Sequence, residues 1–393
     1  MRLVFATADF VYASRPRPGF PLILSDDMTP AQPFHAYLRW LLLERGKALD
    51  VKTWESYGRH IWDFASFLHA NGFAWNRPFT SVGASVLRVY RDWQAQDLKL
   101  EPRFVNARLR IVQGFYRWAL GRRMIERLPF TTSDVTVYGI EHDLTHETGG
   151  RRTFDKSDLE LAEWDKDPVF LTAEQIRLAR SNIRSTSQRL LFDLMARVGL
   201  RSLEARTFPL CAVFEPATRQ HLKPDSLIEV SLDPRRMRTK FSKPRVVHVP
   251  YSLMEEMHAY SQFERNRTLD PKRESSTLLL TTQGNAYSKG AVHKAMTDLG
   301  RRLGFAIQPL MLRHSYAIHT LLLLRAHPEI KMEPLLYVRD RLGHADVKTT
   351  MVYLKQIDRL LGAEALALME EFDRLYDVTS LLRSSPAVLP ETG

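Results

Sequence analysis

Four separated stretches in the C-terminal half of the chain each carry a side chain that phosphoryl transfer needs. Arg201 follows an expected helix end, and Lys240 lies in a basic run between two β-prone segments. Arg313 lies near the start of an apolar helical pattern, and the fourth stretch contains His344 and Tyr353. Cationic side chains can meet the negative charge that a phosphate gains when it is attacked, and a tyrosine hydroxyl can be the attacking group. Together these side chains indicate a phosphate-transfer site.

The fourth stretch is expected to form a corner between two helices. Gly343 follows a periodic apolar segment and is the residue type that most readily ends a helix in a left-handed conformation. Asp346 is a good N-cap for a second helix, on which Thr350 and Tyr353 share one side. The pattern therefore predicts His344 in the turn and Tyr353 about two helical turns further on.

The charge of the chain indicates a polyanionic partner. Its 393 residues include 56 Lys and Arg against 45 Asp and Glu, which leaves a formal net charge of +11. Net charge alone does not separate nucleic acid from a membrane surface. The basic residues are spread over the whole chain, however, which favours folded DNA-binding surfaces over a basic tail.

Cysteine content and hydropathy predict a soluble cytoplasmic protein without a disulfide framework. Cys211 is the single cysteine, and we expect it to be a small buried hydrophobe. No apolar run approaches the roughly 20 residues that span a bilayer, and the first residues do not resemble a signal peptide. Residues 389–393 match the sortase recognition pentapeptide but lack a hydrophobic tail, so they indicate chance or an added tag.

The pattern of helical, β-prone and linker-like segments divides the chain into five parts. Proline-broken β-prone runs open the chain, four helical patterns follow, and a glycine-containing charged stretch then precedes a second domain that starts with a capping box at residues 172–175. The expected bounds are 1–27 for an extended arm, 28–132 for a helical domain, 133–168 for a linker, 169–378 for the second domain and 379–393 for a tail.

The second domain is expected to contain a small β-hairpin among its helices. Residues 226–232 and 245–249 are β-prone and are joined by a basic connection, and helical patterns return from residue 291. The predicted fold class is therefore mainly α with a small antiparallel β-sheet in the second domain.

The fourth helical pattern carries a row of arginines. Arg103, Arg110 and Arg117 repeat every seven residues on a face away from the apolar stripe. Such a row is either an ordinary solvated surface or a strip that faces DNA phosphates. The sequence leaves both interpretations open.

Three sequence boxes, taken in order, resemble the tyrosine recombinase (phage integrase) family. They are Gly-Leu-Arg-x-x-Glu from Gly199, Leu-Arg-His-Ser-Tyr-Ala from Leu312, and Leu-Gly-His-x-Asp-x-x-Thr-Thr-x-x-Tyr from Leu342. Each box alone is weak, but the combination is specific. The resemblance covers most of the chain and implies a helical core-binding domain followed by a mixed α/β catalytic domain.

The resemblance also implies roles for the boxed residues. Arg201 and Arg313 would clamp the scissile phosphate, His344 would support it, and Tyr353 would be the nucleophile. Glu204 matches the acidic partner of the first arginine. Two guanidinium groups can bind the phosphate oxygens bidentately and keep their charge, which agrees with these roles.

The basic connection of the hairpin supplies the remaining implied groups. The resemblance makes Lys240 the general acid that protonates the leaving 5′-oxygen, with Lys243 as the alternative. We expect Lys243 and Arg245 to contact DNA, and of the two interpretations of the arginine row we adopt the phosphate-facing one as the prediction to test.

The family resemblance implies a partner and an assembly as well. The partner is double-stranded DNA with specific recombination sites, and the working unit is a homotetramer on DNA, with no cofactor, no metal and no membrane. Leu368, Phe372 and Leu375 form an amphipathic segment that docks either on a neighbouring subunit or on its own domain. Accessory proteins, and the choice among integration, excision and resolution, are not predicted.

Two departures from the family pattern affect the chemistry. Leu310 stands three residues before Arg313, where the family usually has histidine, and residues 325–333 resemble an insertion. We predict a competent but slowed enzyme, with water or a nearby polar group taking the tyrosine proton. His314 is expected to be a poor substitute, because the next helical residue points about 100° away from Arg313. A type IB topoisomerase and a catalytically silent DNA-binding relative are the alternative interpretations.

Overall fold

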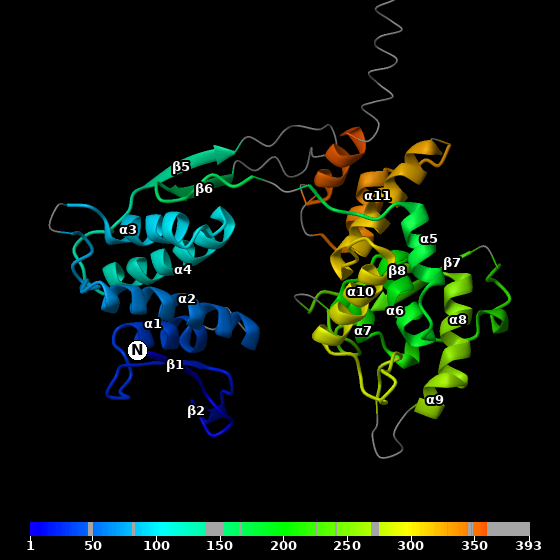
Figure 1. Cartoon of the computed structure of the whole chain (residues 1–393), viewed down its shortest axis with the longest axis horizontal. Coiled ribbons are helices and arrows are strands. Elements are labelled where there is room, and N and C mark those ends of the chain that lie inside the picture. The colour runs from blue at the N-terminus through cyan, green and yellow to red at the C-terminus, as the bar shows by residue number, and fades with distance from the viewer. Residues whose placement is uncertain are drawn as a thin grey trace, which may run out of the picture. The chain divides into compact units, whose positions relative to one another are not determined.

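The computed structural model describes residues 1–45, 50–80, 83–137, 152–164, 167–224, 226–239, 242–268, 275–327, 329–344, 347 and 349–359. Contacts within the chain divide it into an N-terminal unit, Met1–Asp165, and a C-terminal unit, Lys166–Gly393 (Figure 1). Helices are the main regular structure in both units, and two-stranded antiparallel sheets accompany them. Within the described ranges, no helix is both long and apolar enough to cross a membrane.

Helices form the body of the N-terminal unit. They are α1 (Phe34–Arg39), α2 (Val51–Ala70), α3 (Val86–Asp92) and α4 (Pro102–Gly121), with π-helical turns at Trp40–Glu44 and Trp93–Asp97 (Figure 1). Helix α2 begins after Asp50, whose side chain accepts a hydrogen bond from the backbone N–H of Lys52. Helix α4 begins with Pro102, whose fixed φ suits the first helical turn.

An aromatic cluster fills the core between these helices. Phe64, Tyr90, Phe115 and Tyr116 are completely buried. The ring centroids of Phe64 and Tyr90 lie 5.1 Å apart, and those of Phe115 and Tyr116 lie 5.2 Å apart, both in edge-to-face arrangements. Such pairs add about 0.5–1.5 kcal/mol each to the large apolar area that the rings bury.

The first 27 residues are part of this unit, so the expectation that they form an extended arm is wrong. Their strands form two antiparallel pairs, β1 (Arg2–Phe5) with β4 (Pro21–Leu24) and β2 (Val11–Tyr12) with β3 (Arg15–Pro16). Phe20 and Ile23 are completely buried in the same core as the helices. The prolines suggested broken structure, but in two-stranded sheets every strand is an edge, where the missing N–H of proline is tolerated.

Most of the expected linker at 133–168 also belongs to the N-terminal unit. Strand β5 (Thr132–Val137) pairs with β6 (Arg152–Ser157), and Leu159 is completely buried. The side chain of Asn106 donates to the carbonyl of Leu161 and accepts from its N–H, both at 2.9 Å. The polar composition of β5 and β6 concealed these strands, because β-pairing satisfies the backbone whatever the side chains are.

The C-terminal unit contains the expected hairpin among its helices. The helices are α5 (Ala173–Ser181), α6 (Thr186–Ala196), α7 (Ser202–Arg206), α8 (Tyr251–Gln262), α9 (Glu264–Thr268), α10 (Lys289–Leu303), α11 (Pro309–Ala326) and α12 (Pro334–Leu342) (Figure 1). Short 3-10 turns lie at Leu210–Ala212 and Pro216–Thr218, and residues 349–359 are also helical. The expected capping box at the start of α5 is present, between Thr172 and Gln175.

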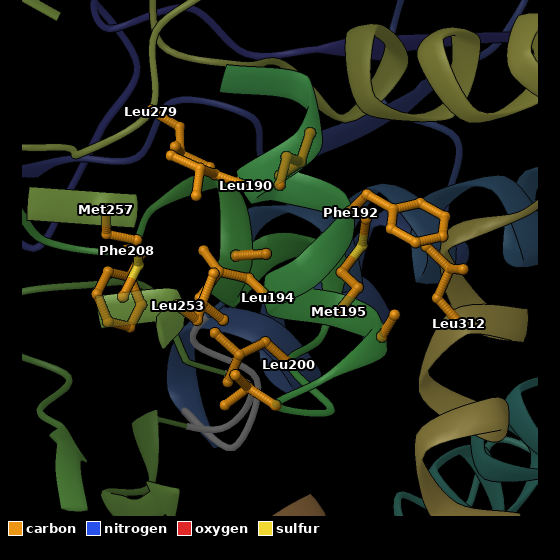
Figure 2. Packing of buried hydrophobic residues seen from close by; sticks show 14 of the residues in the cluster. Leu190, Phe192, Leu194, Met195, Leu200, Phe208, Leu253, Met257, Leu279 and Leu312 are labelled. Carbon is orange, nitrogen blue, oxygen red and sulfur yellow. The ribbon is translucent and has the colours of Figure 1, made fainter. Parts of the chain in front are cut away.

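Helix α6 lies at the centre of this unit. Leu190, Phe192, Leu194 and Met195 point in different directions around the helix, and all are completely buried (Figure 2). Residues 190–196 of α6 are buried on every side of the helix, and α6 packs against both α8 and α11. The loop after α6 therefore starts from a rigid base.

The hairpin pairs β7 (Leu227–Leu232) with β8 (Arg245–Pro250). Residues of β7 alternate between exposed and buried, and Leu232 lies opposite Arg245 in the register. Strand β8 contacts α12, which places Arg245 beside the corner that follows α12. The predicted fold class, mainly α with a small antiparallel sheet in this domain, is confirmed.

The expectation of a buried cysteine is wrong. Cys211 is exposed on the 3-10 turn Leu210–Ala212. Its sulfur lies 3.9 Å from Nη1 of Arg236. Cysteine is buried in most proteins, but here its position on a surface turn exposes the side chain.

Candidate active site

A tight turn after α6 positions Arg201. Gly199 has φ +72°, and a β-carbon there would lie 2.4 Å from Cδ1 of Tyr316, so both backbone conformation and close packing against α11 require glycine. Arg201 is the N-cap residue of α7, and its backbone N–H donates to Oε2 of Glu204 at 2.8 Å. The first turn of α7 therefore fixes the relation between the two side chains.

Glu204 is the centre of a charged cluster. Its carboxylate is completely buried and accepts from Nη1 of Arg201 at 3.2 Å. Nη1 and Nη2 of Arg245 donate to its two oxygens at 2.7 and 2.6 Å, a bidentate pair. Nε of Arg245 also donates to the carbonyl of Arg341 at 3.0 Å. Glu204 and Arg245 together tie α7, β8 and the end of α12 to one point.

The electrostatics of Glu204 keep it ionised. Burial acts to raise its pKa, but the hydrogen bonds and charges of Arg245 and Arg201 outweigh burial and lower the pKa to about 2. Glu204 therefore carries its negative charge at neutral pH.

Arg313 is the most buried of the three arginines of the site. It is only 4% exposed, on α11, and donates to the carbonyls of Gly199 at 2.6 Å and Leu342 at 2.5 Å. Burial and the neighbouring Arg201 lower its pKa to about 9, so the guanidinium remains charged at neutral pH. These two contacts hold the turn after α6 next to the end of α12. Arg201 joins the same two segments, because it donates to the carbonyl of Gly343, 142 residues away in the sequence, at 3.4 Å.

Tyr353 lies within this cationic cluster. It is 3% exposed, on the helix at residues 349–359, and its hydroxyl lies 2.8 Å from Nδ1 of His314. Burial raises the pKa of the hydroxyl, while the charges of Arg313 and Arg201 act to lower it. The two arginines are therefore close enough to favour the tyrosine anion.

His344 occupies the corner after α12, as expected. Gly343 ends the helix with φ +62°, and a β-carbon there would lie 2.8 Å from Cδ of Arg245. The His344 ring stacks on Tyr353, with centroids 6.3 Å apart and planes 17° apart, and its Nδ1 lies 2.9 Å from Oγ1 of Thr350. Burial and Arg313 lower the pKa of His344 to about 3, so its ring is neutral. Asp346, the expected N-cap, lies outside the described residues.

The residues of the basic connection have different surroundings in the structure. Lys240, expected as the general acid, lies outside the described residues. Lys243 is described and exposed. Arg245, expected to contact DNA, instead directs its guanidinium to Glu204 and to a backbone carbonyl, which favours a positioning role.

His314 is the residue that the sequence reasoning dismissed. Leu310 is 60% exposed at the start of α11, while His314 reaches the Tyr353 hydroxyl. The relevant reference for the direction of His314 is Leu310, not Arg313. Residues four apart in a helix share a face and differ by only about 40° in direction, so His314 lies one turn along from Leu310 on the same side.

The arginine row of α4 is paired within its own unit. Arg110 contacts Glu160 at 3.1 Å and Glu163 at 3.3 Å, and Arg103 contacts Glu101 at 3.0 Å. The guanidinium of Arg117 lies 5.1 Å from the ring centroid of Phe130. The row is exposed, and these contacts do not separate the two interpretations of it.

Metal ligands form no comparable cluster. Among the residues that the structure describes, no three His, Cys, Asp or Glu side chains come together as a metal-binding group. The charges that surround Tyr353 in the described region belong to arginine side chains.

Comparison with known proteins agrees with this arrangement. Residues 170–359 match the model of the phage integrase family. The chain is 34% identical over 115 residues to the tyrosine recombinase XerC of Pseudomonas entomophila strain L48, which covers 29% of this chain and 34% of that protein. It is 30% identical over 211 residues to the tyrosine recombinase XerA of Thermococcus onnurineus strain NA1, which covers 52% of this chain and 64% of that protein. The matched stretches thus span between about a third and two thirds of these relatives.

A solved structure shares the fold over more of the chain. The XerH site-specific recombinase, bound to its palindromic difH substrate in a post-cleavage complex, matches with a TM-score of 0.55 at 16% identity, covering 86% of this chain and 88% of that chain. The similarity supports the two-domain tyrosine recombinase architecture. Residues 170–359, the part of the chain that matches the phage integrase family model, contain the turn of Arg201, the buried Arg313 and the helix of Tyr353.

Proposed function

We propose that this chain is a site-specific DNA recombinase that cleaves and rejoins DNA through a 3′-phosphotyrosine at Tyr353. One observation carries the proposal: Arg201 and Arg313 contact the backbone carbonyls of Gly343 and Leu342, directly before His344. The ring of His344 stacks on Tyr353, so residues from three distant parts of the sequence meet at one point. The family match over residues 170–359 supports the same conclusion.

The two arginines would bind the scissile phosphate. As the phosphate approaches a pentavalent state, its non-bridging oxygens gain negative charge, and guanidinium groups can bind them bidentately. Arg313 is held by two backbone carbonyls and Arg201 by Glu204, so neither must be reoriented during the reaction. His344, neutral and stacked on Tyr353, would donate a further hydrogen bond to a phosphate oxygen.

The reaction would proceed by direct exchange at phosphorus. The Tyr353 oxygen loses its proton and forms a bond to phosphorus, while the bond from phosphorus to the 5′-oxygen breaks. The leaving 5′-oxygen takes a proton, for which we propose Lys240, with Lys243 as the alternative. Because a phosphodiester replaces a phosphodiester, the step is reversible and needs no high-energy cofactor.

We propose double-stranded DNA with specific recombination sites as the partner. XerH, a structural relative, is bound to its difH DNA substrate. The net charge of +11, exposed Lys243 and the row Arg103, Arg110 and Arg117 are consistent with phosphate contacts. A homotetramer on two sites, working in the cytoplasm where such DNA is found, completes the proposal. The segment with Leu368, Phe372 and Leu375 lies outside the described residues.

Two alternatives share parts of this account. A type IB topoisomerase would form the same covalent bond but relax one duplex instead of exchanging two. A catalytically silent relative would bind DNA without forming the bond, as the exposed Leu310 in place of histidine suggested. The match to site-specific recombinases and the helical N-terminal unit favour the recombinase.

A covalent-adduct assay tests the proposal. A cognate duplex is first enriched from a randomised pool by its binding to the Tyr353→Phe variant. The same duplex, nicked just downstream of the cleavage point so that the short fragment carrying the released 5′-hydroxyl diffuses away, then traps the adduct on a denaturing gel. We expect an adduct with the parent chain and none with Tyr353→Phe, which should bind the duplex about as tightly, because the lost hydroxyl contributes chemistry rather than affinity.

The assay should succeed in excess EDTA, because side chains supply the positive charge. Failure of the parent chain to form any adduct on a duplex that it binds would support the silent relative. Loss of the adduct on chelation, with recovery on adding magnesium, would overturn the metal-free mechanism. Two-site substrates distinguish the enzymes, since only the recombinase yields exchanged products.

A further inference from the structure

The Tyr353 hydroxyl has an identified neighbour that can accept a proton. Nδ1 of His314 lies 2.8 Å from the hydroxyl oxygen, and the two ring centroids lie 5.5 Å apart with planes at 56°. The two side chains come from α11 and from the helix at residues 349–359, so packing of these helices fixes the contact. Ile318, Leu321 and Ile357 are completely buried between them.

The other polar groups around Tyr353 are unsuited to take the proton. Arginine has five N–H donors and no acceptor, so Arg201 and Arg313 can stabilise the phenolate but cannot accept from the phenol. His344 stacks on the tyrosine ring with its plane only 17° away, and its Nδ1 contacts Thr350. His314 instead presents a ring nitrogen to the hydroxyl.

The charge around His314 favours its neutral, accepting form. Burial and the charge of Arg313 lower the pKa of His314 to about 4, so the ring is neutral at physiological pH. A neutral imidazole has one acceptor nitrogen, and a proton on Nε2 leaves Nδ1 free to accept from the phenol.

We propose that His314 is the general base of the cleavage step, taking the place of the histidine that Leu310 replaces. The inference rests on the proposed function. As the Tyr353 oxygen attacks phosphorus, its O–H bond breaks and the proton moves to Nδ1 of His314. The 5′-oxygen leaves with a proton from the general acid. In religation the 5′-hydroxyl gives its proton back to the general acid and attacks phosphorus, the bond between phosphorus and the tyrosine oxygen breaks, and His314 returns the proton to Tyr353.

Binding of DNA makes His314 a better base. A phosphodiester held by Arg313 brings a negative charge that offsets one of the two causes that lower the pKa of the ring. Substrate binding therefore raises the basicity of His314 at the moment when the proton must leave. General base catalysis of this kind contributes about 10²–10⁴-fold to rate.

Two substitutions separate proton transfer from hydrogen bonding. His314→Asn places a carbonyl oxygen near the position of Nδ1, so it retains an acceptor without basicity, and His314→Ala removes both. We expect both variants to slow single-turnover adduct formation by about 10²–10⁴-fold while binding the duplex like the parent. His319→Gln is the matched control on the same helix, because that histidine contacts the carbonyl of Leu171 instead. It should cleave at the parental rate.

A sulfur-substituted duplex identifies the side of the reaction. When sulfur replaces the bridging 5′-oxygen, the leaving group needs no proton, so a defect in the general acid is rescued. We expect the His314 variants to remain slow on this duplex, because their defect concerns the nucleophile. Rescue by sulfur, or parental cleavage by His314→Asn, would overturn the assignment. If the parent chain forms no adduct, the proposed function has failed instead.

A second measurement does not depend on cleavage or on the folding of a variant at position 314. In the full-length chain with ¹⁵N-labelled histidine, the ring of His314 should carry its proton on Nε2. Its Nδ1 resonance should shift when Tyr353 is replaced by Phe. A proton on Nδ1, or a resonance that ignores Tyr353→Phe, would contradict the proposal.

Discussion

Arginine serves opposite purposes in the two units. On α4 of the N-terminal unit, Arg110 is exposed and contacts both Glu160 and Glu163, so carboxylates outnumber the guanidinium there. In the C-terminal unit, Arg201, Arg245 and Arg313 gather around the buried Glu204. Backbone carbonyls supply the remaining acceptors there, and they carry no formal charge.

The difference shows how a fold prepares a site for an anion. Exposed ion pairs contribute about 0–1 kcal/mol, so the α4 row can give up its carboxylates for phosphates at little cost. In the site, guanidinium groups outnumber the carboxylate, and burial keeps water from screening the excess charge. The excess remains until a phosphate, or the phenolate of Tyr353, offsets it.

The largest effect should follow from removing the buried arginine. We expect Arg313→Ala to reduce single-turnover adduct formation by roughly 10³–10⁵-fold, the range that an arginine contributes at a transferring phosphoryl group. Arg110→Ala is the control on the other unit and should cleave at nearly the parental rate when DNA is saturating. A loss of less than tenfold in Arg313→Ala, with the fold intact by circular dichroism, would contradict the clamp.

Removing the buried carboxylate of Glu204 should destabilise the C-terminal unit far more than removing its counterpart beside α4 destabilises the N-terminal unit. Glu204→Gln leaves Arg201 and Arg245 without their anion, and losing one partner of a buried pair typically costs about 3–5 kcal/mol. Glu160→Gln, its counterpart beside α4, should cost less than about 1 kcal/mol. All seven tryptophans lie within the N-terminal unit, so tryptophan fluorescence follows that unit, and hydrogen exchange of α6 and α7 follows the other.

The pH dependence of Glu204 has a definite sign. Its pKa is about 2 in the folded chain against an ordinary 4.5, so its contribution to stability is complete above pH 4.5 and is lost as pH falls towards 2. Exchange protection of α7 should therefore fall across this window more steeply in the parent than in Glu204→Gln. Parallel curves for the two proteins, or equal destabilisation by Glu204→Gln and Glu160→Gln, would remove the distinction between the units.

The smallest effect concerns the α4 row. If Arg110 exchanges its carboxylates for a DNA phosphate, Arg110→Ala should lower the salt dependence of binding by about 0.9 on a log–log scale while hardly changing stability. Affinity for the enriched duplex is measured between 50 and 300 mM salt, on the order of the range where screening is strong. An unchanged slope would make the row an ordinary solvated surface.

Local pattern predicted much of this molecule, and tertiary contact decided the rest. The hairpin, the capping box at Thr172 and the corner at Gly343 depend on neighbouring residues, so the sequence indicated them. Strands β5 and β6 are polar and carry fewer of the apolar residues that marked the strands of the hairpin. Their assignment as a linker was therefore wrong, because residue propensities do not reveal that two polar segments pair.

The site shows the same division. Arg201, Arg313, His344 and Tyr353 were found through their boxes, and the structure brings them together. The role of Arg245 arises because β8 meets α7 after a separation of 41 residues, so its type alone suggested DNA contact. His314 could have been found, because its spacing of four from Leu310 places both on one helical face.

The most direct test of the account is to identify the atom that carries the DNA. The adduct trapped by the parent chain is digested with protease and nuclease, and the nucleotide-bearing peptide is sequenced by mass spectrometry. We predict a single modified residue, Tyr353, joined to a 3′-phosphate, with a free 5′-hydroxyl on the released strand. A 5′-phosphate linkage, or attachment to any residue other than Tyr353, would contradict the account.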